Sequence, residues 1–303
     1  MEIKALVSQM TLEEKAGLCS GLDFWHTKSV ERLGVPSVMV SDGPHGLRKQ
    51  DDKGDHLGIN DSIKAVCMPA ASATAASFDR DLIRKMGEAI GDSCQHEKLS
   101  VVLGPAVNIK RSPLCGRNFE YYSEDPLLTG LCAATIIQSL QADGTAGATI
   151  KHMACNNQEE NRGGMNAHVS ERALREIYLK GYEIAIRKAR PQAIMTGHNL
   201  VNGVNAAESC DLLTAASREE WGFDGLVMTD WGTTTKAGQK TKYGPSDCDS
   251  CIRAGTDLIM PGSKEDLREI ISAVQSGRLS RRDLRWSAWN ILRVMQRLYQ
   301  EVC

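Results

Sequence analysis

The chain has 303 residues, of which 42% are hydrophobic and 24% charged, and its formal net charge is −2. This size and balance are typical of one large α/β domain or two ordinary globular domains. A near-neutral charge does not favour a nucleic-acid or anionic-membrane partner. No apolar run is long enough to span a bilayer. Residues 1–10 lack the apolar core of a signal peptide, so we expect a cytoplasmic protein.

The ten cysteines do not form a disulfide or zinc pattern. Cys248 and Cys251 make a C-x-x-C pair, but no second pair completes a zinc site. A chain of this length can bury a core without disulfides. We therefore expect reduced thiols, no metal and no cofactor, and a redox or metal role for this pair is the less favoured alternative.

Sequence patterns predict alternating strands and helices along the chain. Apolar runs that stop at Gly, Pro or polar residues predict buried strands in the stretches 35–44, 100–105, 145–153, 193–199, 225–232 and 257–262. Helical spacing and capping residues, such as Thr11 with Glu14 three positions later, predict helices. These helices cover 11–19, 79–99, 126–142, 170–189, 212–221, 248–254, 264–276 and 281–301. Polar loops are expected at 49–61 and 156–167.

Six apolar runs that alternate with helices indicate a parallel sheet with helical crossovers. The length of the chain fits a closed (β/α)8 barrel of the TIM type. A doubly wound sheet should carry a Gly-rich phosphate loop after its first strand, and residues 42–46 lack that spacing. We predict an α/β fold in which residues 1–303 form a single (β/α)8 barrel domain.

Polar and aromatic residues follow several of the predicted strands, and in a barrel these strand ends share one mouth. The residues are Asp42, Lys151, His152, Met195, His198, Asp230 and Trp231. Alone, Asp230 is equally consistent with a turn cap and Lys151 with an ion-pair partner. Together, donors and acceptors around an aromatic platform favour a neutral polyhydroxylated ligand such as a sugar. A metal site would need clustered His, Cys or carboxylate ligands, and we find none in the sequence.

Five spaced motifs resemble the N-terminal barrel domain of glycoside hydrolase family 3 β-glucosidases. They are DGPHGLR at 42–48, GRNFE at 116–120, KH at 151–152, MT at 195–196 and TDWG at 229–232. They occur in the order and spacing of that family, and the resemblance runs from about Leu6 to the final helix. It implies a retaining, exo-acting β-glycosidase that hydrolyses the O-glycosidic bonds of a β-glycoside or oligosaccharide.

The resemblance also implies a role for each matching residue. Asp230 matches the nucleophile, which forms a covalent glycosyl-enzyme, and Asp42 matches an acceptor for sugar hydroxyls. Donors to the sugar are implied at Arg117, Lys151, His152 and Arg162, a loop support at Arg48, and apolar walls at Met195 and Trp231. Lys and Arg side chains near Asp230 are expected to keep its carboxylate ionised.

The acid/base residue is not identified by these motifs. Retaining hydrolysis needs a second carboxyl group about 5 Å from the nucleophile. In multidomain relatives a Glu from a second α/β sandwich domain supplies it, and residues 1–303 do not include that domain. The single-domain branch of the family uses an Asp-His pair in the loop that corresponds to 156–167, and this loop lacks its signature. Glu159, Glu160 and His168 remain possible substitutes.

Two functional hypotheses follow from this pattern. The first is a glycosidase whose acid/base comes from a second domain or a partner chain, which includes a homo-oligomer. The second is a carbohydrate-binding or catalytically impaired barrel fragment.

His198 stands where the family has Tyr, and this departure leads to a prediction. The Tyr hydroxyl hydrogen-bonds near the nucleophile, whereas a His can take up a proton at mildly acid pH. We predict that His198→Tyr leaves kcat/KM on an aryl β-glucoside unchanged or raises it. A large loss of kcat/KM would show that His198 has a role that Tyr cannot fill.

Overall fold

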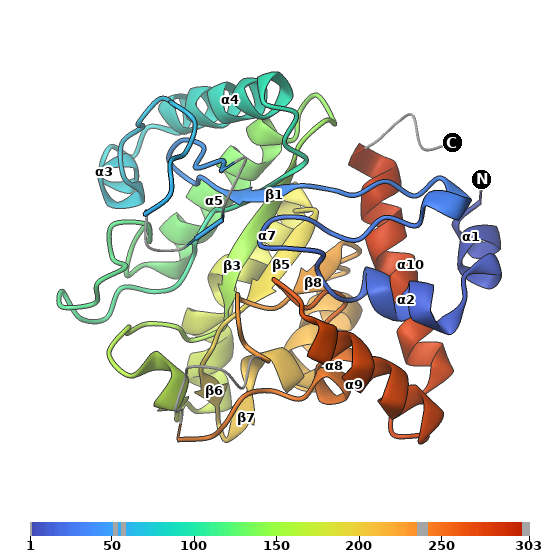
Figure 1. The fold of residues 1–303 in the computed structure, drawn as a ribbon. Helices are drawn as coiled ribbons and strands as arrows, with labels where there is room; N and C mark the ends of the chain where they lie inside the picture. The colour runs from blue at the N-terminus through green and yellow to red at the C-terminus, as the bar shows by residue number, and fades with distance from the viewer. Residues whose placement is uncertain (1, 51–53, 56–58, 235–241, 299–303) are drawn as a thin grey trace.

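A five-stranded parallel sheet forms the centre of the molecule (Figure 1). Its strands lie in the order β1 (Val40–Asp42), β2 (Val101–Leu103), β3 (Gly147–Met153), β5 (Ala193–Thr196) and β8 (Leu226–Met228). Most of their residues are buried, as expected for parallel strands covered on both faces. The computed structural model describes residues 2–50, 54–55, 59–234 and 242–298.

The parallel ladder continues past β8 through isolated bridges. Met228 pairs with Leu258, and Ile259 pairs with Ser20, so the predicted 257–262 strand contributes bridges in place of a full strand. Pro261 and Gly262 follow at once and end the pairing. In the described ranges we therefore find a barrel-like arrangement of five parallel strands and bridged segments. The α/β class is confirmed, but eight complete strands are not seen there.

Helices surround the sheet. They are α1 (Ile3–Gln9), α2 (Leu12–Leu18), α3 (Ala71–Ala76), α4 (Arg80–His96), α5 (Pro126–Leu140), α6 (Glu171–Ala173), α7 (Lys180–Ala189), α8 (Cys248–Ala254), α9 (Lys264–Gln275) and α10 (Arg281–Leu298). The capping box of Thr11 and Glu14 is present at α2. Helix α5 packs between α4 and α7, where Gly87 faces Ser139 and Gly130 faces Ile184, and a Cβ at either glycine would clash. Among the described residues, no helix has the length and apolar character that crossing a membrane requires.

Several predicted boundaries are wrong. The 35–44 strand begins only at Val40, because Val35 and Met39 form bridges with Val30 and His26. The predicted helix 170–189 is interrupted by a π-helical turn, Leu174–Tyr178, and the predicted helix 212–221 is π-helical over Asp211–Glu220. The spacing of apolar residues does not distinguish an α-helix from a short π-helical turn, because in both one face recurs at nearly the same interval along the chain.

Two predictions fall partly outside the described residues, and one small sheet was not predicted. The end of the predicted helix 281–301 and part of the loop 49–61 lie outside the described ranges. The small sheet joins β4 (Asn166–Ala167), β6 (Leu200–Val201) and β7 (Val204–Asn205). These strands have only two residues each, too few for an alternating pattern to show.

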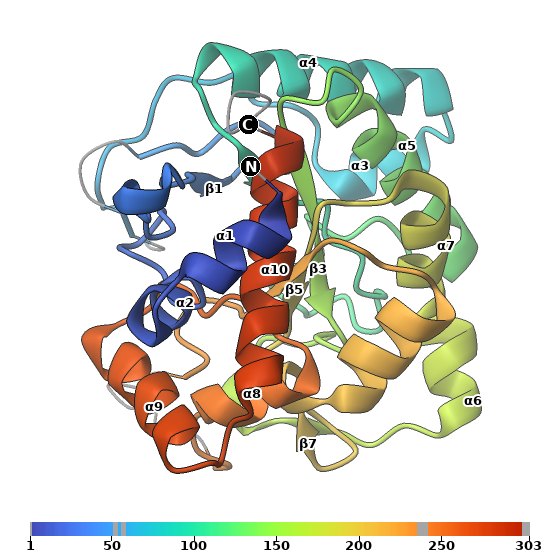
Figure 2. The same ribbon diagram turned by 90° about the vertical axis from the view of Figure 1, so that its right-hand side faces the viewer.

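Helix α10 closes the end of the sheet at which the strands begin, and Figure 2 shows it crossing the front of the molecule. Asn290 Nδ2 donates to Asp257 Oδ1 over 2.9 Å, and Arg297 Nη2 donates to Asp224 Oδ2 over 2.6 Å. Both acids precede strand segments. The side chain of Leu298 also lies against Gly147, the first residue of β3. The opposite end, where the strands finish, is the end that a barrel enzyme uses for chemistry.

Both cysteines of the C-x-x-C pair are buried free thiols on α8. Cys248 Sγ donates to Asp266 Oδ1 over 3.3 Å. Burial is the main reason that the pKa of both thiols is raised, and nearby carboxylates raise it further. A raised pKa suppresses the thiolate that redox or metal chemistry requires.

Asp257 offers a test of how α10 is joined to the sheet. This fully buried carboxylate accepts from Val227 N over 2.7 Å, from Arg218 Nη2 over 2.6 Å and from Asn290. Asp257→Ala leaves the Arg218 charge buried without its partner, so we predict a loss of about 3–5 kcal/mol in the free energy of unfolding. Urea unfolding measures it.

The exposed pair of Arg172 with Glu176 provides the control for this experiment. Arg172→Ala should leave the urea midpoint almost unchanged, because exposed ion pairs contribute little. Equal midpoints for the two variants would contradict the structural role of Asp257.

Candidate active site

The strand ends gather the predicted polar residues at the end of the sheet opposite α10. Asp42 is the last residue of β1, and Lys151 and His152 lie near the end of β3. The register between β3 and β5 shifts between Ile150 and Met153, which is where these two residues lie. Such irregularities change the direction of side chains near a site. His198 and Asp230 each follow a strand, β5 and β8, by two residues.

Asp230 is a buried carboxylate, 8% exposed, with its two oxygens in different surroundings. Oδ1 accepts a hydrogen bond from Trp231 N over 2.8 Å. Oδ2 accepts none from the described residues, although His198 Nε2 is 3.2 Å and His152 Nε2 3.9 Å away. Burial alone would raise the pKa of Asp230, but His198, Arg162, Arg117 and the Trp231 N–H outweigh it and hold the pKa below its ordinary value.

His198 lies between Asp230 and the turn that follows it. Its Nδ1 is 3.3 Å from Thr233 Oγ1, and that hydroxyl is also 2.8 Å from the Asp230 carbonyl oxygen. The ring is buried, and burial lowers the pKa of His198 more strongly than the Asp230 carboxylate raises it. His198 is therefore neutral at pH 7. The sequence alone predicts that its charge changes at mildly acid pH, and the lowered pKa moves that change to more acid conditions.

A chain of hydrogen bonds and close polar contacts leads from Asp230 to Asp42. Arg117 Nη2 donates to His152 Nε2 over 2.8 Å, and Arg117 Nε donates to Glu120 Oε1. Lys151 Nζ lies 3.8 Å from Glu120 Oε2 and 3.6 Å from Asp42 Oδ1.

His152 is neutral in this chain. Burial, then the charges of Arg117 and Lys151, place the pKa of His152 well below its ordinary value. Because Arg can only donate, the neutral ring carries its proton on Nδ1.

The remaining predicted cations lie at the edge of this cluster. Arg48 Nη1 is 3.6 Å from Asp42 Oδ2, and Arg48 Nη2 donates to the Asp55 carbonyl oxygen over 2.7 Å. Arg162 Nη1 is 3.1 Å from Glu159 Oε2. Arg162 also lowers the pKa of Asp230 through its charge, although no direct contact joins them.

The two predicted apolar residues are both buried, but they differ in position. Trp231 lies beside Phe24 and Trp25, with ring centroids 6.4 Å and 5.6 Å away, and its Nε1 donates to the Phe24 carbonyl oxygen over 2.8 Å. Met195 is a β5 residue in the hydrophobic core, paired with Met228 of β8. The structure thus joins Trp231 directly to Asp230 and places Met195 one strand away.

The three candidate acid/base residues occupy different positions. Glu159 Oε1 accepts from Asn156 Nδ2 over 3.1 Å and lies 3.7 Å from Arg117 Nη1, while its Oε2 contacts Arg162. Both Glu159 oxygens are therefore engaged. Glu160 and His168 are exposed, and His168 Nε2 lies 3.2 Å from Asn166 Nδ2.

Two polar residues of the cluster were not among the predicted site residues. Glu120 closes the GRNFE motif, three positions after Arg117, and this i, i+3 pairing of opposite charges was the available signal. Thr233 follows Asp230 by three positions, but a Thr in a turn does not by itself indicate a contact with a distant His.

Several buried polar atoms in this region have no hydrogen-bond partner among the described residues. They include Asp230 Oδ2, His152 Nδ1 and both ring nitrogens of His45. Unpaired buried polar atoms are rare in folded proteins, and a polar ligand is one explanation for a group of them. Within the part of the chain that the structure describes, no group of three or more His, Cys, Asp and Glu residues is placed to hold a metal ion.

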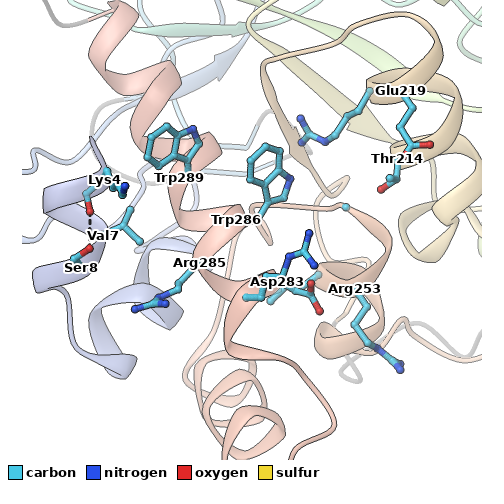
Figure 3. A pocket seen from close by; sticks show the side chains of 14 residues that line it. Lys4, Val7, Ser8, Thr214, Glu219, Arg253, Asp283, Arg285, Trp286 and Trp289 are labelled. Atoms are coloured by element: carbon cyan, nitrogen blue, oxygen red, sulfur yellow. Dashed lines mark hydrogen bonds between the residues drawn. The ribbon is translucent and has the colours of Figure 1, made fainter. Parts of the chain in front are cut away.

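A separate pocket of about 740 Å³ lies on the α10 side of the molecule (Figure 3). Trp286 and Trp289 of α10 line it, with Lys4 and Val7 of α1 on one side and Thr214 on the other. None of the predicted site residues lines this pocket. The candidate active site is therefore the cluster around Asp230.

Comparison with known proteins identifies the family. Residues 24–294 match the model of the glycosyl hydrolase family 3 N terminal domain. The chain is 49% identical over 296 residues to thermostable beta-glucosidase B of Acetivibrio thermocellus, which covers 97% of this chain and 38% of the relative. It is 46% identical over 272 residues to an exo-alpha-(1->6)-L-arabinopyranosidase of Bifidobacterium longum, covering 89% of this chain and 34% of the relative.

Solved structures agree with this assignment. Beta-glucosidase 3B from Thermotoga neapolitana in complex with glucose superposes with a TM-score of 0.88 at 37% identity, covering 98% of this chain and 43% of that one. The Bifidobacterium adolescentis family 3 beta-glucosidase gives a TM-score of 0.86 at 40% identity, covering 98% and 40%. The chain thus spans well under half the length of these relatives, and it belongs to glycosyl hydrolase family 3, matching the N-terminal domain of that family.

Proposed function

We propose that this chain carries the nucleophile and sugar-binding residues of a retaining, exo-acting β-glycosidase of the β-glucosidase type. The observation that carries the proposal is Asp230: a buried carboxylate with a lowered pKa and one oxygen that accepts no hydrogen bond from the described residues. The family relatives named as β-glucosidases support this substrate class. The relative named as an arabinopyranosidase leaves the identity of the sugar open.

A nucleophilic carboxylate needs a fixed orientation and an oxygen that is free to attack, and the two Asp230 oxygens meet one requirement each. The Trp231 N–H holds Oδ1 and so fixes the orientation of the carboxylate. Oδ2 is left to attack the anomeric carbon, which forms the Oδ2–carbon bond as the bond to the leaving oxygen breaks. The lowered pKa keeps the carboxylate ionised over the neutral range.

The surrounding residues fit a polyhydroxylated ligand. Arg117, Lys151 and His152 lie in one connected network, with Asp42 as the acceptor at its far end. We assign these four side chains to the sugar hydroxyls, with Arg162 at the edge and Arg48 holding Asp42. Trp231 and Met195 are assigned to the apolar sides of the ring. Hydrogen bonds to hydroxyls that tighten in the transition state contribute to catalysis.

We further propose that the acid/base residue lies outside the described residues, in a second domain or a partner chain. Both oxygens of Glu159 are engaged by Asn156, Arg117 and Arg162, so this side chain is poorly placed to give a proton to a leaving group. Glu160 and His168 are exposed, and neither forms a hydrogen bond or ion pair with Asp230. The relatives are much longer than this chain, which is consistent with an additional domain.

The alternative function is a carbohydrate-binding or catalytically impaired barrel fragment. Both carboxylate oxygens of Glu159 already have partners, so Glu159 is a poor acid, and this favours the alternative function. A nucleophile without an acid turns over only substrates with good leaving groups. The two functions are separated by a substrate whose leaving group needs no proton.

An activated aryl β-glucoside provides this test. We predict that mixing it with the chain releases a burst of phenol equal to about one per active site, because Asp230 forms the glycosyl-enzyme without acid assistance. Asp230→Asn should abolish the burst, since the amide is not a nucleophile. Asp81→Asn, at an exposed site on α4, is the matched control and should keep it. Sugar binding without any burst would favour the binding function.

The acid side of the pH profile is a second test. A lowered Asp230 pKa means that the reactive carboxylate is present above that pKa and is lost as the pH falls through it. His198 has a lowered pKa as well, so it takes up its proton only below its ordinary pKa of about 6.5. We therefore predict that kcat/KM for the aryl glycoside stays level from pH 8 to 7, that any change due to His198 falls below about pH 6.5, and that the loss due to Asp230 falls below the ordinary Asp pKa of about 3.9.

Circular dichroism at each pH separates this titration from acid unfolding. An inflection in kcat/KM between pH 6.5 and 8, with the fold intact, would contradict the protonation states assigned to His198 and Asp230.

A further inference from the structure

We propose that Glu120 is a positioning residue, which fixes the direction in which Arg117 and Lys151 present their N–H groups to the sugar. The inference rests on the proposed function for its consequence, but its structural part can be tested without turnover.

Glu120 joins two cations that come from different parts of the fold. It is 5% exposed and lies in the segment between β2 and α5. One carboxylate oxygen accepts from Arg117 Nε, and the other lies 3.8 Å from Lys151 Nζ on β3. The backbone N–H of Glu120 donates to the Arg117 carbonyl oxygen over 3.1 Å, so a tight turn sets the Arg117–Glu120 pair.

Holding one edge of a guanidinium fixes the rest of it. The five N–H donors of Arg form a rigid planar fork, so the bond from Nε to Glu120 determines where the two Nη groups point. Nη2 donates to His152 Nε2 over 2.8 Å, and that ring nitrogen is 3.9 Å from Asp230 Oδ2. Nη1 is 3.7 Å from Glu159 Oε1. Glu120 thus directs the Nη side of Arg117 toward the nucleophile.

Glu120 also supplies a negative charge beside Arg117 and Lys151, so that Asp42 and Asp230 do not have to supply all of it. Arg117 and Lys151 are cations in a buried region, and each requires a nearby anion. Without Glu120, the carboxylates that remain near these cations are those of Asp42, Glu159 and Asp230. Asp42 Oδ1 is already 3.6 Å from Lys151 Nζ. Partial neutralisation by Glu120 leaves Asp42 free to accept from sugar hydroxyls and Asp230 free to react.

Two variants of Glu120 distinguish the effect of its negative charge from the effect of where that charge lies. Glu120→Gln keeps the shape and removes the charge, whereas Glu120→Asp keeps the charge but is one methylene too short to reach both cations. We expect Glu120→Gln to lower kcat/KM on the aryl glycoside by tenfold or more and Glu120→Asp to lower it as well. Glu124→Gln, an exposed Glu four residues later, is the matched control and should be unchanged. Rates are corrected for the folded fraction.

The tautomer of His152 reports the Arg117 direction independently of activity. Donation from Arg117 makes Nε2 an acceptor, so the ¹⁵N spectrum of labelled His should show His152 protonated on Nδ1. In Glu120→Gln the guanidinium loses its anchor, and the Nε2 signal should shift as that donor is lost. His152→Asn identifies the resonance.

The proposal is supported only if both readouts change in Glu120→Gln and the control changes neither. An unchanged His152 signal overturns it, whatever the rate, because Glu120 is then only a buried ion-pair partner. An unchanged kcat/KM with a shifted His152 signal also overturns it, because the Arg117 direction then has no consequence for the sugar. If the unmodified chain gives no burst, the proposed function fails, while the His152 signal still tests the contact.

Discussion

The structure around the site depends on keeping one buried carboxylate, Asp230, ionised. Burial by itself opposes the charge, and desolvation of an ionised group is costly unless other charges or donors compensate it. At neutral pH the compensation comes from Arg117 between β2 and α5, Arg162 in the loop after β3, and the Trp231 N–H after β8. Each group comes from a different strand or loop, so only the assembled sheet can bring them together.

This requirement makes the geometry of the sheet part of the chemistry. The parallel register of β1, β2, β3, β5 and β8 places their carboxyl ends at one edge. Helix α10 covers the other end through Asn290 and Arg297, so the polar groups at its surface are paired with acids that precede the strands. Charged groups therefore concentrate in two layers with an apolar core between them. The acids of the α10 layer are paired, whereas the other layer retains unpaired atoms at Asp230, His152 and His45.

The cluster also shows why the bonding of a side chain matters as much as its identity. Glu159 lies close to Arg117 and would satisfy a search for a second carboxyl group by proximity. Its partners, two guanidinium groups and an amide, make it an acceptor in the network. Glu120 is similarly surrounded by cations, and its value lies in what it does to Arg117 and Lys151. A carboxyl group that gives a proton needs different surroundings, in which burial or a neighbouring anion favours the neutral form.

The sequence by itself determined the α/β class, the alternation of elements and the residues at the strand ends. Apolar runs such as 226–228 and caps such as Thr11 with Glu14 are local signals. They can be recognised in the sequence without knowing which distant residues the segment contacts. The motif order around Asp42, Lys151 and Asp230 was also sufficient for the family. Only the tertiary structure decided which side chains pair. The π-helical turns, the two-residue strands at Asn166 and Leu200, and the bridging position of Glu120 depend on contacts between residues far apart in the chain. Those contacts set pKa values and hydrogen-bond direction, which are properties of the assembled site and not of any one segment.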